Sequence, residues 1–179
     1  ALGEGAWTRG GVVLAAALPA LLLFVWREAR ATAPMVPLSL FRNSDFSGAN
    51  MLTVLQYAAL GGALFLLPFL LIRVHGYSAA AAGAAFLPFS VIMGVGSRWA
   101  GRLVDRFGSR LPLIIGPALT AAGFAMLALS GTEPSYWRGF LPGLIVVGIG
   151  MTIVVAPLTT TVLNAAPDDM SGTASGINN

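Results

Sequence analysis

The charged stretch of residues 101–110 constrains the fold of this chain more than any other feature, because a long apolar run flanks it on each side. The two runs, residues 79–100 and 111–130, are long enough to cross a bilayer, for which a helix needs about 20 apolar residues. Water must solvate the charges that lie between them. The pattern therefore predicts two membrane helices joined by a tight charged turn at the membrane surface.

The composition also points to a membrane environment. Of the 179 residues, 56% are hydrophobic and 9% are charged, and the mean hydropathy is +0.81. A soluble domain carries about 25% charged residues, so this chain has too few charges to cover a soluble surface. Ten arginines and seven acidic residues give a net charge of +3. The arginines lie at the ends of apolar runs and form no single basic stripe, so we expect no nucleic-acid partner.

Five apolar segments are long enough to be membrane helices, and no alternating pattern of barrel strands accompanies them. The fold class that we predict is all-α, a polytopic transmembrane helix bundle with about five membrane helices. The predicted spans are residues 8–26, 46–72, 79–100, 111–130 and 139–163.

The distribution of arginines predicts an orientation, because short basic loops stay in the cytosol. The richer side holds Arg27, Arg30, Arg42, Arg102, Arg106 and Arg110, and the other side holds Arg9, Arg73 and Arg138. We therefore expect the connector of residues 27–43 and the charged turn in the cytosol. The loops of residues 73–78 and 132–138 are expected on the outer side.

Both ends of the chain indicate a fragment of a larger protein. The chain begins without methionine, and residues 171–176 have the pattern of a capped helix start shortly before the last residue, Asn179. We therefore expect further membrane helices outside this sequence.

The charged turn carries a pattern of glycines, one acid and arginines, made by Gly101, Asp105, Arg106, Gly108 and Arg110. This pattern resembles the G-x-x-x-D-R-x-G-x-R signature of the major facilitator superfamily, which lies between the second and third helices of a six-helix half.

Further motifs follow in the matching order. The sequence P-M-V-P-L-S-L-F-R of residues 34–42 resembles the connector that precedes the C-terminal half in the fourteen-span drug:proton antiporters. Residues 76–88 are similar to that branch's entry to the next helix. Residues 148–157 and 171–179 resemble the fourth helix of the half and the start of the fifth.

The resemblance implies a multidrug efflux permease of the bacterial inner membrane, which exports small amphiphilic compounds in exchange for protons by alternating access. Residues 1–43 would hold the last extra membrane helix and a cytoplasmic connector. Residues 44–179 would hold the first four helices of the C-terminal half and the start of the next. The partners would be the substrate, protons, the lipid bilayer and the N-terminal half of the same polypeptide, which carries the proton-coupling acids. No cofactor is implied.

The charged turn has a plausible role in gating. Gly101 and Gly108 allow close packing and a tight reversal. Asp105 can accept hydrogen bonds from a helix N-terminus or pair with an arginine, and both contacts are charge-assisted. We expect this loop to act as a latch that stabilises one conformation. The alternative is a solvated loop that only marks the cytosolic side.

Polar groups inside the spans are candidates for a transport pathway, since such groups usually face a cavity or another helix. The candidates are Asn50, Thr53, Gln56, Tyr57, Thr152 and Thr159. The alternative is that they form hydrogen bonds between helices without touching a substrate. Pro68, Pro88 and Pro157 are expected to kink their helices.

Among function classes, a secondary transporter is favoured. An enzyme is not expected, because the chain has no H-E-x-x-H or G-x-S-x-G motif and no paired carboxylates within a span. No metal site is expected either, because His75 is the single histidine and has no acidic neighbour in its loop. The alternatives are a permease for one specific metabolite and a membrane scaffold subunit that does not transport.

Overall fold

The structure is a computed structural model that describes residues 4–31, 34–130 and 135–179. Within the first range, solvent exposure is described for Gly11 and from residue 15 onward. This part of the chain is helical and contains no strand, so the prediction of an all-α fold is confirmed. The helices are α1 (Glu4–Glu28), α2 (Ser44–Arg73), α3 (Ala79–Ala84), α4 (Leu87–Phe107), α5 (Arg110–Leu129), α6 (Leu141–Asn164) and α7 (Ser171–Asn178). Shorter helical turns are η1 (Leu38–Arg42), η2 (Tyr136–Phe140) and η3 (Asp168–Met170).

Four helical segments within the described residues are long and apolar enough to cross a membrane. They are Ser44–Arg73, Ala79–Phe107, Arg110–Leu129 and Tyr136–Asn164. Each contains or closely matches one predicted span. The remaining predicted span, residues 8–26, lies in α1, where several side chains fall outside the described part. Its assignment as a membrane helix stays a prediction.

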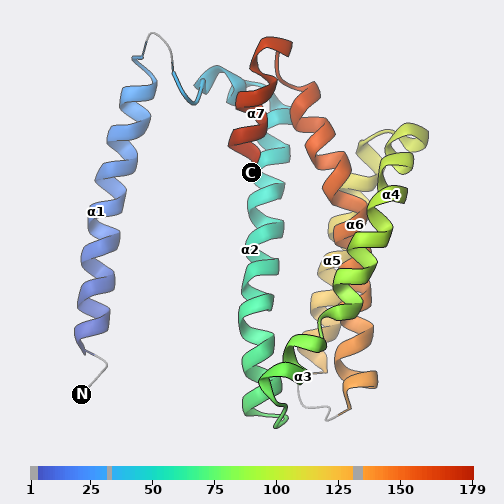
Figure 1. Cartoon of the computed structure of the whole chain (residues 1–179). Coiled ribbons are helices and arrows are strands. Elements are labelled where there is room, and N and C mark those ends of the chain that lie inside the picture. Colours follow the sequence, from blue (N-terminus) through green and yellow to red (C-terminus); the bar gives the residue numbers. More distant parts are fainter. Residues whose placement is uncertain (1–3, 32–33, 131–134) are drawn as a thin grey trace.

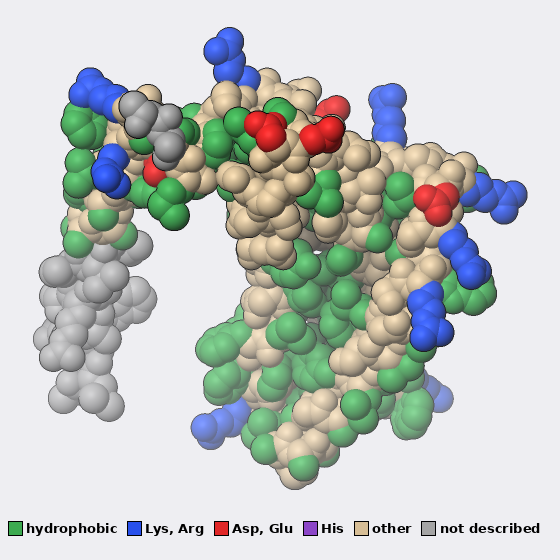
Figure 2. Space-filling model, turned by 45° about the horizontal axis from the view of Figure 1, so that its top comes forward, with side chains coloured by type: hydrophobic (Ala, Val, Ile, Leu, Met, Phe, Trp, Pro, Cys, Tyr) green, Lys and Arg blue, Asp and Glu red, His purple; other side chains and the backbone are tan. Residues whose placement is uncertain are grey.

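The helices run back and forth between two ends of the molecule, and α1 stands apart from the others (Figure 1). The connector, the α4–α5 turn and the α6–α7 loop lie at one end, whereas the α2–α3 turn lies at the other. Most of the arginine side chains and the acidic side chains visible in Figure 2 gather toward the first end, and hydrophobic side chains cover the middle. The first end is the one expected in the cytosol, and the orientation in the membrane stays a prediction.

Helices α5 and α6 approach each other closely through two pairs of glycines. A Cβ atom added to Gly123 would lie 2.9 Å from the Gly143 oxygen, and one added to Gly150 would lie 2.7 Å from the Gly116 oxygen. A larger residue would therefore collide with the facing backbone. Small residues drive such contacts in membranes because they increase van der Waals packing.

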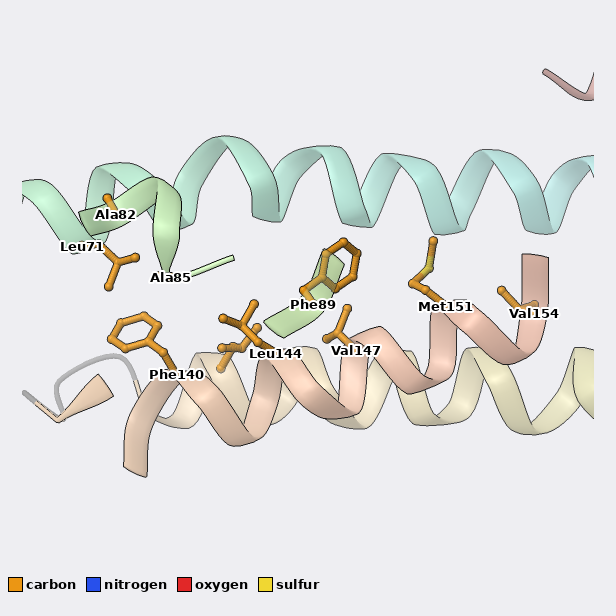
Figure 3. Close-up of a cluster of buried hydrophobic side chains, with 10 residues drawn as sticks. Leu71, Ala82, Ala85, Phe89, Phe140, Leu144, Val147, Met151 and Val154 are labelled. Atoms are coloured by element: carbon orange, nitrogen blue, oxygen red, sulfur yellow. The ribbon is translucent and has the colours of Figure 1, made fainter. Parts of the chain in front are cut away.

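The main hydrophobic core fills the space between α2 and the α5–α6 pair (Figure 3). Leu71 of α2, Phe89 of α4 and Met151 of α6 are buried in it. The short helix α3 crosses the end of the bundle at which α2 ends (Figure 1). Ser78 caps the start of α3, since its hydroxyl oxygen accepts a hydrogen bond from the N–H of Ala81 at 3.2 Å. The core thereby packs α2, α3, α4 and α6 against one another.

The prediction that residues 101–110 form a turn is wrong in its extent. Helix α4 continues to Phe107, so Gly101 and Asp105 lie on its last two turns and the reversal is confined to Gly108 and Ser109. Exposed charged side chains do not prevent a helix, because they extend into water while the backbone hydrogen bonds continue. The helix ends at Gly108, whose φ of 68° suits glycine.

The third predicted span is also interrupted, between α3 and α4. Pro88 was expected to kink a continuous helix, but it lies in the first turn of α4, where proline removes no helical hydrogen bond. Pro68 and Pro157 do lie inside α2 and α6, and their effect on helix bending stays a prediction.

Candidate functional site

Three polar side chains lie on one face of α2, on successive turns. Asn50, Thr53 and Gln56 are buried, although they lie on a helix whose other faces are largely exposed. The Asn50 amide donates to the oxygen of Phe46 at 2.9 Å, and the Thr53 hydroxyl donates to the oxygen of Ala49 at 3.0 Å. Asn50 and Thr53 thus each use one local bond and keep an acceptor directed to another helix.

Asn178 of α7 binds both of these acceptors. Its side-chain nitrogen donates to the Asn50 side-chain oxygen at 3.2 Å and to the Thr53 hydroxyl oxygen at 2.7 Å. An amide nitrogen carries two hydrogens, so both bonds can form at once. Sequence reasoning missed Asn178, because nothing local to it indicates that it faces α2.

Gln56 points to a different partner. Its side-chain nitrogen lies 3.5 Å from the hydroxyl of Thr120 on α5, which in turn donates to the oxygen of Gly116 at 3.0 Å. Thr120 is 1% exposed and was not a predicted site residue. The α2 polar face therefore contacts both α7 and α5.

A cavity of about 340 Å³ opens beside this cluster, among α2, α6 and α7. Its lining is Thr53, Val54, Tyr57, Val155, Leu158, Thr159, Ile177, Asn178 and Asn179. A neighbouring hollow of about 440 Å³ shares Thr53, Val54, Ile177 and Asn178 with it and also reaches Asn50. Thr53 and Asn178 therefore contribute to the walls of both spaces. The walls combine amide, hydroxyl and phenol groups with aliphatic side chains.

The predicted pathway residues do not all line one space, and Gln56 meets Thr120 of α5. Thr53, Tyr57 and Thr159 line the 340 Å³ cavity, and Asn50 lines the hollow beside it. Thr152 lies instead against α4, with its hydroxyl 3.5 Å from the oxygen of Ile92. The same hydroxyl donates to the oxygen of Gly148 in its own helix at 2.7 Å.

Thr152 and Thr159 share a face of an ideal helix, but their surroundings differ because the neighbours of α6 change along its length. The side chain of Thr152 occupies the space that a Cβ on Gly96 of α4 would need. Thr159 lies farther along α6, where the cavity is lined by α2 and α7.

The residues of the predicted latch lie at the C-terminal end of α4 and the start of α5. Asp105, Arg106 and Arg110 are exposed, and a Cβ on Gly101 would meet no atom within 4 Å. Among the described residues, Asp105 forms no ion pair, and the Arg106 guanidinium lies 5.4 Å from the centre of the Phe107 ring. A latch partner would therefore have to come from elsewhere, and the latch stays a prediction.

His75 is half-buried at the opposite end of the bundle. Its ring meets the ring of Phe140 edge to face at 5.2 Å between centroids, and its buried Nε2 atom has no hydrogen-bond partner among the residues that the structure describes. The described side chains include no group of three metal-binding residues.

The described helices thus form an apolar bundle with a partly polar cavity among α2, α6 and α7. Residues 5–179 match the sequence profile of the Major Facilitator Superfamily. The chain belongs to this superfamily.

Relatives of known role share most of the chain. It is 35% identical over 165 residues to the tetracenomycin C resistance and export protein of Streptomyces glaucescens, covering 92% of this chain and 30% of the relative. It is 35% identical over 166 residues to the multidrug resistance protein Stp of Mycobacterium tuberculosis, covering 93% and 30%. It is 30% identical over 166 residues to the quinolone resistance protein NorB of Staphylococcus aureus, covering 92% and 36%. The chain thus spans about a third of the length of these relatives.

Proposed function

We propose that this chain is part of a secondary transporter that exports small amphiphilic compounds across a bacterial inner membrane by alternating access, in exchange for protons. The observation that carries the proposal is the cavity among α2, α6 and α7, with Thr53, Tyr57 and Asn178 in its wall. Polar groups at membrane depth are costly unless they face a cavity or a partner. The names of the relatives, which are export and resistance proteins, support the same class.

The chemistry of the cavity fits an amphiphile. Thr53 and Asn178 offer hydrogen-bonding groups, whereas Val54, Leu158 and Ile177 offer apolar surface. Ligand sites of this kind are mostly apolar and use a few polar groups for orientation. No lining side chain is charged, so this part of the site would recognise shape and hydrogen bonds.

Proton coupling is assigned to another part of the protein. The acidic side chains that the structure describes are Glu28, Asp45, Asp105, Asp168 and Asp169, and they lie near helix ends or in loops. A coupling group has to be reached from both sides of the membrane and therefore has to lie near its centre. Residues 1–43 then serve as an extra helix with its connector, and residues 44–179 supply cavity wall and gate. We propose no enzymatic role.

Transport by the full-length protein in proteoliposomes tests the proposal. With an imposed pH gradient, an amphiphilic fluorescent dye should move against its concentration gradient, and a protonophore should abolish this movement. Failure of several amphiphiles to move, with movement of one polar metabolite, would favour the specific permease. Movement of no solute would favour the scaffold.

A matched pair of threonines links transport to this cavity. Thr159 lines it, whereas the next residue, Thr160, does not, and both hydroxyls bond to a backbone oxygen of their own helix. Thr159→Val should change the apparent affinity for dye, and Thr160→Val should leave it near the wild-type value. Equal behaviour of the two variants would remove the cavity from the pathway.

A further inference from the structure

A second recess lies between α4 and α6 and takes no part in the site described above. It is a crevice of about 190 Å³ lined on α4 by Ile92, Gly96, Trp99 and Leu103 and on α6 by Ile149 and Thr152, among others. Thr152 contributes a hydroxyl group to the wall of the crevice, but this hydroxyl already donates a hydrogen bond to the oxygen of Gly148. The crevice is therefore an apolar surface with no free polar group to orient a drug-like molecule.

A row of arginines leads away from this crevice toward the cytosolic end. Arg98, Arg102 and Arg106 follow one another at intervals of four residues on α4, and all three are exposed. Residues three apart are neighbours on a helix surface, so Arg102 lies next to Trp99 and Arg106 next to Leu103. The crevice therefore has positive charge at its rim.

We propose that this site binds one anionic phospholipid of the cytosolic leaflet, with an acyl chain in the crevice and the phosphate on Arg102 and Arg106. Charge complementarity carries the assignment, since basic clusters at the cytosolic end of a membrane helix attract anionic lipids. Free phosphate would satisfy the arginines and leave the apolar crevice uncovered. A neutral lipid would cover the crevice and leave the positive charges unmatched.

Trp99 is placed to contact both parts of such a lipid. It is 65% exposed and lies in the crevice wall next to the arginine row. Tryptophan favours the boundary between hydrocarbon and headgroups because its ring is amphipathic. The site is independent of the exported compound and of proton coupling.

Lipid titration of the purified full-length protein tests the charge requirement. The probes are phosphatidylglycerol, phosphatidylcholine and inorganic phosphate, and the readout is the shift in Tm as each is added. Phosphatidylglycerol should act at the lowest concentration. Arg102→Gln and Arg106→Gln should each raise, about fivefold, the phosphatidylglycerol concentration that gives half of the full Tm shift. The control is the double variant Arg73→Gln/Arg138→Gln, whose exposed arginines lie at the opposite end, and it should leave that concentration unchanged.

Photo-crosslinking of the full-length protein in cells tests the position. Benzoylphenylalanine at position 99 should capture phosphatidylglycerol, identified by mass spectrometry, whereas the same group at Trp137, 74% exposed at the other end, should capture much less. Attachment at position 99 mainly to polypeptide would overturn the proposal, because another part of the protein would then cover the crevice. Equal effects of both lipids, or a Tm shift from phosphate alone, would overturn it as well.

Discussion

The side chain of Asn178 donates a hydrogen bond of 2.7 Å to the hydroxyl of Thr53, although 125 residues separate the two in the sequence. This contact joins the C-terminal end of α7 to the buried polar face of α2 and lies in the wall of the cavity among α2, α6 and α7. It links packing to function, because the same two residues that hold the helices together also line the space proposed for substrate.

The Asn178–Thr53 contact should contribute measurably to stability. Thr53→Val should lower the stability of the full-length protein by about 1 kcal/mol, as expected for one hydrogen bond. Asn178→Ala removes the bond to Asn50 as well and should cost about 2 kcal/mol. Because both changes remove the same bond, the double variant should be less destabilised than the sum of the two. Thermal unfolding in detergent measures this coupling. Strictly additive effects would show that the contact does not exist in solution.

The close contact of α5 with α6 should tolerate no side chain at Gly123. A Cβ there would lie 2.6 Å from the backbone nitrogen of Val147, and backbone cannot yield as a flexible side chain does. Gly123→Ala should destabilise the protein by about 1–3 kcal/mol, the usual range for overpacking. The control is Gly61→Ala on α2, where a Cβ meets nothing within 4 Å. If Gly123→Ala and Gly61→Ala lost the same amount of folded protein in a thermal assay, the close contact of α5 and α6 at Gly123 would be contradicted.

Asp105 should matter more for transport than for folding. Its carboxylate is exposed near the C-terminal end of α4 and has no ion partner among the described residues, so Asp105→Asn should leave membrane insertion and abundance nearly unchanged. If Asp105 latches onto another part of the protein, the dye export rate should fall severalfold at equal protein level. Asp169→Asn, at another exposed acid, is the control. Wild-type export by Asp105→Asn would leave only the solvated-loop interpretation.

Cysteine labelling should place the two ends of the bundle on opposite sides of the membrane. The chain contains no cysteine, so Ser109→Cys and Ser135→Cys can be introduced one at a time into a cysteine-free full-length protein. A membrane-impermeant maleimide should label position 135 in intact cells and position 109 only after permeabilisation. Labelling of both positions from outside would reverse or refute the proposed topology.

The helices could be predicted from local sequence, because membrane helices depend on the length of apolar runs and on where charges interrupt them. Within residues 44–164, the described spans contain or closely match the predicted ones. The details at their ends could not be predicted in the same way. Helix α4 continues through Asp105 to Phe107, because exposed charges and helical hydrogen bonds are compatible, and the chain reverses at Gly108.

The sequence by itself thus determined the fold class, the spans of α2, α5 and α6, and the polar residues of α2. Only the tertiary structure decided which polar groups meet. Asn178 joins Asn50 and Thr53, Gln56 faces Thr120, and Thr152 turns to α4. Hydrophobicity acts along each helix and can be read locally. The rotation and crossing of helices depend on contacts such as the paired glycines of α5 and α6, which bring together residues that are far apart in the sequence.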